Sequence, residues 1–115
     1  MADQAREAVL EVLRRAPLPQ AVIASSGLIL LGITEALRET SLVVPQDIAL
    51  AGFDNMPWTR LVEPGLTVIS QPTYEIGREA IEMLLQRIAA PDKVPRQLVL
   101  RGELLVRNSS SARRH

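Results

Sequence analysis

The sequence predicts an α/β fold in which a layer of parallel strands is flanked by helices. Short apolar runs alternate along the chain with segments whose apolar residues recur at helical spacing. Strands separated by helices favour a parallel sheet with right-handed crossovers. Only about four strands can be placed, whereas sheets average roughly five to six. We therefore expect an incomplete layer, as in a fragment of a larger α/β protein.

The first part of the chain predicts a helix, a strand and a second helix. Apolar residues between positions 5 and 13 line one helix face, and Pro17 ends that helix. Residues 21–24 form a short candidate strand. Ser25-Ser26-Gly27 is either a hairpin turn or the N-cap of a helix over about 28–39. We favour the helix, because Ser is a preferred N-cap and the end of this segment has high helix propensity.

The remainder predicts further strands around one long helix. The expected elements are a strand over 48–53, an irregular loop over 54–65, a strand over 66–69, a helix from Pro72 to about Ala90, strands over 97–100 and 103–106, and a polar tail from Asn108. Pro72 suits a helix N-terminus, where its missing N–H is harmless.

Asp54 is the candidate binding residue. The apolar run 48–53 reads as a buried strand that ends abruptly on Gly52-Phe53-Asp54-Asn55. It would deliver an acid to the carboxyl edge of the sheet, where ligands of open α/β proteins bind. A carboxylate without a catalytic or metal partner suits a small ligand rich in hydroxyls. The alternative is an ordinary turn, since Asp-Asn is common turn chemistry.

Composition argues against several other functions. Thirteen basic and thirteen acidic residues balance, so the chain lacks the positive charge typical of nucleic-acid binding. Without cysteine it has no disulfide or thiolate chemistry, which is compatible with a reducing cytoplasm. The sole histidine, His115, closes a polar tail, so no catalytic base or metal cluster is evident and we expect no enzyme and no cofactor. The longest apolar run, 28–33, is too short to span a bilayer.

Five motifs, in order, resemble the LacI/GalR family of bacterial transcription regulators. They occupy residues 21–32, 44–55, 64–72, 75–80 and 105–109, and include Val44-Pro45-Gln46-Asp47, Gly52-Phe53-Asp54-Asn55 and Leu66-Thr67-Val68. The resemblance implies an incomplete type I periplasmic-binding-protein-like fold, forming the C-terminal part of an effector-binding domain. Residues 1–70 would belong to its second lobe and 71–100 would cross toward the first lobe. Residues 101–115 would be a return strand and tail.

The resemblance also implies which residues bind the effector. Asp54 matches the acidic residue with which members of this family bind the effector. Ser26 and Gly27 stand where many relatives have Asn-Asp, so Ser26 offers a hydroxyl but Gly27 cannot replace the acid. Gln71 lies near the cleft at the crossover, and Trp58 either walls the cleft or packs beneath it. For Ser26 a helix cap, and for Trp58 packing, are the favoured interpretations.

The expected partners follow from the same resemblance. The effector would be a sugar or sugar derivative, and Leu28, Leu31, Leu61 and Val62 would contribute to a homodimer. DNA would be bound only through a helix-turn-helix head outside this chain, in a cytoplasmic regulator that does not contact membranes. Two alternatives remain open: part of a solute-binding protein for sugar uptake, or a dimerisation module that acts alone.

Overall fold

A computed structural model describes residues 1–111 in two compact units. One unit comprises residues 1–70 and 104–111, and the other comprises residues 71–103. His115, at the end of the predicted polar tail, lies outside the described residues. The two units are described separately below.

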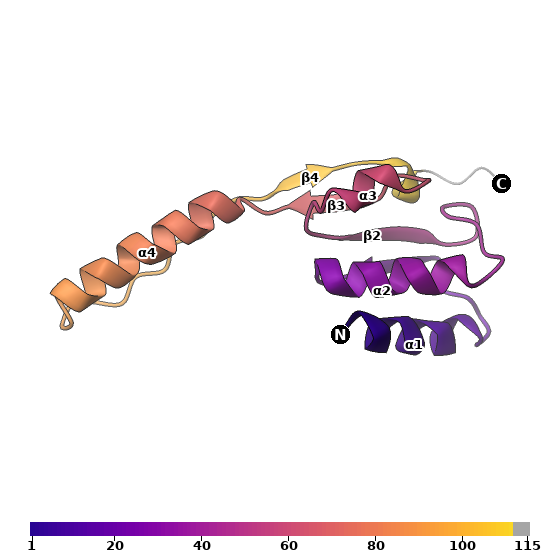
Figure 1. Cartoon of the computed structure of the whole chain (residues 1–115), viewed down its shortest axis with the longest axis horizontal. Coiled ribbons are helices and arrows are strands. Elements are labelled where there is room, and N and C mark those ends of the chain that lie inside the picture. Colours follow the sequence, from indigo (N-terminus) through magenta and orange to yellow (C-terminus); the bar gives the residue numbers. More distant parts are fainter. Residues whose placement is uncertain (112–115) are drawn as a thin grey trace. The chain divides into compact units, whose positions relative to one another are not determined.

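The first unit is built on a sheet with the strand order β1-β2-β3-β4 (Figure 1). Its elements are α1 (Ala2–Leu13), β1 (Ala21–Ala24), α2 (Gly27–Arg38), β2 (Ala49–Phe53), α3 (Trp58–Leu61), β3 (Thr67–Ser70), the 3-10 helix η1 (Asn108–Ser110) and, from its second residue, β4 (Glu103–Leu105). Strands β1, β2 and β3 pair in parallel, with Ala24 beside Gly52 and Gly52 beside Val68. This arrangement confirms the predicted α/β class.

Helix α2 packs directly on the sheet. Leu30 is fully buried, and a Cβ at Gly52 of β2 would lie 2.9 Å from Leu30 Cδ2. Glycine therefore lets the helix and the strand approach closely. The core around them consists of Ala24, Leu30, Ile33, Leu37, Ile48, Leu50, Leu66 and Val68.

Helix α1 packs against α2 at a second glycine. A Cβ at Gly32 would lie 2.2 Å from the carbonyl oxygen of Ala2 and 3.0 Å from the Cβ of Ala5. These distances leave no space for a side chain, so the contact between the two helices depends on the glycine. The apolar stripe predicted over 28–33 is thus covered on more than one side, as a helix that is apolar all round requires.

The second unit contains α4 (Thr73–Ala89), which begins directly after Pro72 as predicted. The strand predicted over 97–100 is wrong, because residues 94–102 form neither helix nor strand. A strand needs a neighbour to pair its backbone groups, and no described strand pairs with this segment. None of the described helices is long and apolar enough to cross a membrane.

Two further predictions need correction. The loop over 54–65 contains the short helix α3, in which the Val62 N–H donates to the Trp58 carbonyl at 3.2 Å. The segment from Asn108 is not simply a solvated tail, because it forms η1 and Ser109 is fully buried. The Ser109 hydroxyl satisfies two backbone groups of the sheet region, so a polar side chain is stable in the interior.

Candidate functional site

The N-terminus of α2 lies beside the end of β2. Ser26 is extended (φ −155°) and its Oγ accepts a hydrogen bond from the Ile29 N–H at 3.3 Å. The helix-cap interpretation of Ser26 is therefore confirmed. The cap leaves the N–H of Gly27 available for a partner outside the helix, since the first N–H groups of a helix have no partner within it.

Asp54 supplies that partner. It follows the last residue of β2, and its Oδ2 accepts a hydrogen bond from the Gly27 N–H at 2.9 Å. Its own N–H donates to the Ile69 carbonyl of β3 at 2.9 Å. Asp54 has φ +79°, in the left-handed region that residues with a side chain rarely adopt. The backbone thus turns sharply at the carboxyl edge of the sheet and places the carboxylate at the start of α2.

This arrangement gives a strong hydrogen-bond acceptor at the carboxyl edge of the sheet. A carboxylate at a helix N-terminus is stabilised by the aligned N–H groups, typically by about 0.3–1 kcal/mol at the surface. Hydrogen bonds to an ionised oxygen are roughly twice as strong as neutral ones. A Cβ at Gly27 would lie 3.4 Å from Asp54 Oδ2 and from Met56 Cγ. At these distances a Cβ would make ordinary van der Waals contact with Asp54 and Met56, so Gly27 lies directly against the carboxylate.

The other two predicted binding residues, Trp58 and Gln71, lie outside this arrangement of Asp54 and Gly27. Trp58 begins α3 and is partly buried against the core, in accord with the packing interpretation. Gln71 belongs to the second unit, where its carbonyl accepts a hydrogen bond from the Thr73 N–H at 2.8 Å. Within the first unit, the structure therefore brings together Asp54, Ser26 and Gly27.

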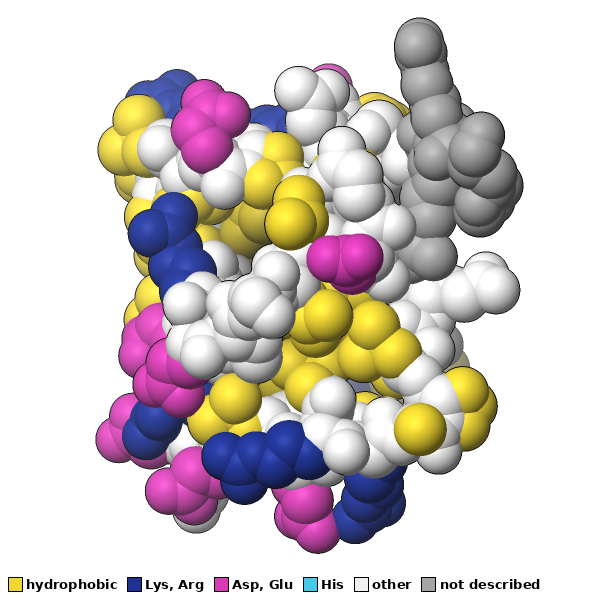
Figure 2. All heavy atoms as spheres, turned by 90° about the vertical axis from the view of Figure 1, so that its right-hand side faces the viewer, with side chains coloured by type: hydrophobic (Ala, Val, Ile, Leu, Met, Phe, Trp, Pro, Cys, Tyr) yellow, Lys and Arg dark blue, Asp and Glu magenta, His cyan; other side chains and the backbone are white. Residues whose placement is uncertain are grey.

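The residues predicted for a dimer divide into exposed and half-buried ones. Leu28 is 56% exposed and Leu61 is 75% exposed, whereas Leu31 and Val62 are half-buried. Figure 2 shows that hydrophobic side chains also reach the surface among charged ones on the face turned to the viewer, although it labels no single residue. Because their side chains are exposed, Leu28 and Leu61 are available for a contact with another protein.

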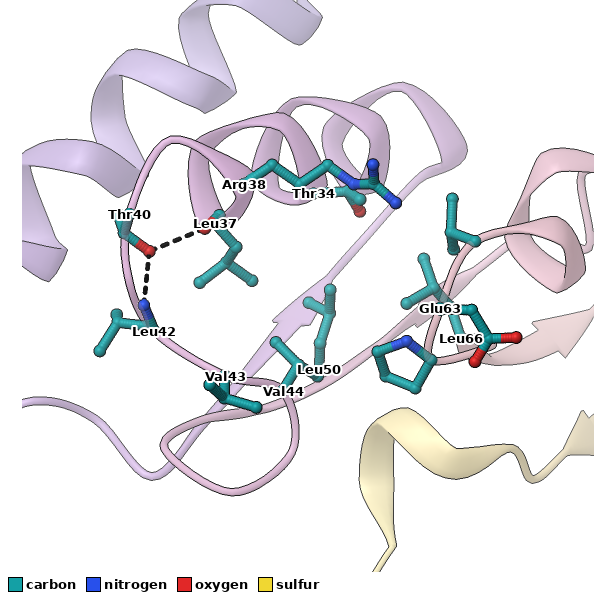
Figure 3. A pocket seen from close by; sticks show the side chains of 12 residues that line it. Thr34, Leu37, Arg38, Thr40, Leu42, Val43, Val44, Leu50, Glu63 and Leu66 are labelled. Atoms are coloured by element: carbon teal, nitrogen blue, oxygen red, sulfur yellow. Dashed lines mark hydrogen bonds between the residues drawn. The ribbon is translucent and has the colours of Figure 1, made fainter.

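A pocket of about 270 Å³ lies at the other edge of the sheet, around the C-terminal part of α2 and the residues before β3 (Figure 3). Leu37, Leu50 and Leu66 contribute to an apolar lining, with Arg38 and Glu63 as its charged members. Sequence analysis did not predict this pocket. Its lining does not match a hydroxyl-rich ligand, and open α/β sheets bind ligands at the carboxyl edge. Asp54 therefore remains the candidate.

Among residues 1–111, no group of three or more His, Asp or Glu side chains is arranged to hold a metal ion. The chemistry that the Asp54 region can perform with its own groups is the acceptance of hydrogen bonds.

Comparisons with known proteins identify the family. Residues 1–110 match the family described as periplasmic binding protein-like domain. The chain is 40% identical over 90 residues to the HTH-type transcriptional regulator KdgR of Bacillus subtilis, covering 78% of this chain and 26% of KdgR. It is 38% identical over 107 residues to the HTH-type transcriptional regulator CelR of Thermobifida fusca, covering 93% of this chain and 32% of CelR.

Solved structures show the same likeness. A complex of the transcriptional regulator CelR with cellobiose has a TM-score of 0.85 and 37% identity, over 96% of this chain and 34% of that one. The chain spans about a quarter to a third of the length of the curated relatives named above. Nearly all residues of the chain match one family, and the sequence and structural comparisons both find transcriptional regulators. These findings agree with one another. The chain belongs to the LacI/GalR family of transcriptional regulators, within the periplasmic-binding-protein-like domain of that family.

Proposed function

We propose that this chain senses a sugar-like effector as part of a LacI-type transcriptional regulator. The observation that carries the proposal is the Asp54 carboxylate, held at the N-terminus of α2 by the Gly27 N–H at 2.9 Å. Cellobiose in the CelR complex supports a sugar as the class of ligand. Hydroxyl groups of a sugar would donate to the carboxylate, which accepts the Gly27 N–H through Oδ2.

Isothermal titration calorimetry tests this role of Asp54. Sugars, beginning with cellobiose, are titrated into the protein that carries this chain. Asp54→Asn should weaken binding at least about ten-fold, because hydrogen bonds to a charged group contribute roughly 1.5–3 kcal/mol each. Asp47→Asn is the matched control. Asp47, like Asp54, is a carboxylate that accepts a backbone N–H, from Val43 at 2.7 Å, but it is exposed and lies in the turn before β2.

Two results would contradict the proposal. Asp54→Asn could bind the sugar as well as the unchanged protein, or Asp47→Asn could weaken binding equally. The first result would remove Asp54 from the site, and the second would indicate a general effect of charge.

The regulatory role belongs to the same proposal. Sugar binding would shift the population between lobe arrangements, and a dimer would transmit that shift to DNA-binding heads outside this chain. The protein would act in the cytoplasm, without catalysis or a cofactor. The relatives KdgR and CelR are regulators, which supports this interpretation over sugar transport.

We also propose that Leu28, Leu31, Leu61 and Val62 contribute to a homodimer. Leu61 is 75% exposed, so it contributes little to the fold of one subunit but can bury apolar area against a second. Sedimentation equilibrium tests this proposal. Leu61→Ser should raise the dimer dissociation constant while the thermal midpoint of the monomer stays unchanged. An unaltered dissociation constant, or a monomer at all concentrations before substitution, would contradict it.

A further inference from the structure

Arg107 joins three separate segments of the first unit. Its Nη1 donates to Thr59 Oγ1 at 3.1 Å and to the Leu66 carbonyl at 3.0 Å, and its Nη2 donates to Asn55 Oδ1 at 3.0 Å. Its methylenes pass over Gly65, where a Cβ would lie 3.4 Å from Arg107 Cδ. These three acceptors are uncharged, so the guanidinium acts here as a branched donor that connects neutral groups.

The backbone of Arg107 is fixed to the sheet. Its N–H donates to Thr67 Oγ1 at 2.9 Å, and its carbonyl accepts from the same hydroxyl at 3.0 Å. Two residues later, the buried Ser109 hydroxyl donates to the Leu50 carbonyl and accepts from the Thr67 N–H at 2.9 Å. The starting point of the side chain is therefore held on both sides, and its planar donor group is preorganised.

The segment that Arg107 holds begins directly after Asp54. Asn55 follows Asp54, and Thr59 lies in α3, where its hydroxyl donates to the Met56 carbonyl at 2.6 Å. A residue with a side chain at φ +79° persists only when its surroundings fix it. Hydrogen bonds to Ile69 and Gly27 fix Asp54 itself. Arg107 fixes the chain on its C-terminal side.

We propose that Arg107 is a positioning residue for Asp54. By anchoring Asn55 and Thr59, it keeps the left-handed turn in place, so that the carboxylate stays against the Gly27 N–H. The C-terminal segment, distant in sequence, thereby controls the geometry of the acid at the sheet edge. Only the consequence for sugar binding rests on the proposed function; the geometric role stands without it.

Lysine should not replace Arg107 in this role. Its ammonium group is a compact point charge and lacks the planar fork that reaches several acceptors at once. Arg107→Lys should therefore behave like Arg107→Met, which keeps most of the apolar contact with Gly65 but removes every donor.

Amide hydrogen exchange, followed by NMR in the ligand-free chain, tests the geometric role. Two amides at the start of α2 are compared: Gly27, which donates to Asp54, and Ile29, which donates to Ser26. Arg107→Met should accelerate exchange at Gly27 about ten-fold relative to Ile29, the scale of one charge-assisted hydrogen bond. Equal acceleration of both amides would overturn the proposal, since a merely structural role predicts that result.

Two variants complete the test. Arg87→Met removes another arginine that donates to backbone carbonyls, those of Pro91 and Lys93 in the second unit, without touching Asn55, so it should leave the exchange of both amides unchanged. Asn55→Ala removes the acceptor of the hydrogen bond from Arg107 Nη2. This variant keeps the proposal testable if Arg107→Met does not fold. It should produce the same selective loss of protection at Gly27. Uniform exchange in Asn55→Ala would also count against the role of Arg107.

Calorimetry with cellobiose then tests the consequence for binding. Arg107→Met should weaken affinity about ten-fold. Adding Asn55→Ala should cause little further loss, because Arg107→Met has already removed the hydrogen bond from Arg107 to Asn55. Arg87→Met should bind within about two-fold of the unchanged protein, because Arg87 donates to Pro91 and Lys93 in the second unit. If the double variant lost as much affinity as the two single variants together, the role of Arg107 in binding would be overturned. If the unchanged protein binds no sugar, the proposed function fails, while the amide comparison still decides the role of Arg107.

Discussion

Gly32→Ala tests the packing that supports α2 and hence the candidate site. On helix propensity alone, replacing Gly by Ala inside a helix should stabilise the protein by about 1 kcal/mol. The structure predicts the opposite sign. The new Cβ would lie 2.2 Å from the backbone oxygen of Ala2 and 3.0 Å from Ala5 Cβ, so α1 must move away from α2.

The expected size follows from two opposing effects. Overpacking a close contact destabilises by about 1–3 kcal/mol, and the gain in propensity offsets about 1 kcal/mol of that. We expect a net loss of about 1 kcal/mol in the free energy of unfolding, measured by urea denaturation with circular dichroism at 25 °C.

Gly77→Ala in α4 is the matched control for this substitution. No atom lies within 4 Å of a Cβ at Gly77, so only the propensity gain should operate there, and thermal unfolding of α4 should shift upward. If Gly32→Ala stabilised the protein as much as Gly77→Ala does, the close contact of α1 with α2 would be refuted.

Three other substitutions test the core and the caps by urea denaturation. Leu30→Ala should lower the free energy of unfolding by about 3–5 kcal/mol, because Leu30 is fully buried and leaves a cavity; a loss under about 1 kcal/mol would contradict its central place. Ser109→Ala should lower it by about 1–3 kcal/mol, since the Leu50 carbonyl and the Thr67 N–H lose a buried partner; a neutral result would mean that water replaces the hydroxyl. Ser26→Ala should lower it by about 1 kcal/mol through loss of the helix cap, and unchanged stability would show that the cap is dispensable.

Much of the layer around Asp54 was predictable from local patterns. The strand that ends before Asp54 is a short apolar run between turn residues, and the helix after Ser26 carries a recognisable cap. Both signals lie within a few neighbouring residues. The position of the acid at the end of β2 therefore follows from sequence. A parallel layer also brings the start of α2, the helix after the neighbouring strand β1, to the same edge of the sheet.

The contacts made by the C-terminal segment were not predictable in the same way. Residues 108–110 are polar and small, which is the pattern of a solvated tail, yet Ser109 is buried through bonds to Leu50 and Thr67, some 40 to 60 residues away. The contacts of Arg107 could not be predicted either, because all its side-chain partners are distant in sequence. The weak signal available was a charged residue placed two positions after a short strand.

The strand predicted over 97–100 failed for a related reason. Gln97-Leu98-Val99-Leu100 has β propensity, but propensity only describes how side chains fit a pleated surface. A strand also requires a partner, and the described chain provides none for this segment. The left-handed backbone of Asp54 was likewise beyond local patterns, since it depends on hydrogen bonds to Ile69 and Gly27.

A crystal structure of the protein that carries this chain, with cellobiose or another sugar that binds it, tests the central claim most directly. We predict a carboxylate oxygen of Asp54 within about 3.0 Å of a sugar hydroxyl, the usual O–H···O distance, with the Gly27 N–H still bonded to the same side chain. A sugar seated in the pocket lined by Leu37, Leu50 and Leu66, with Asp54 out of contact, would contradict the account.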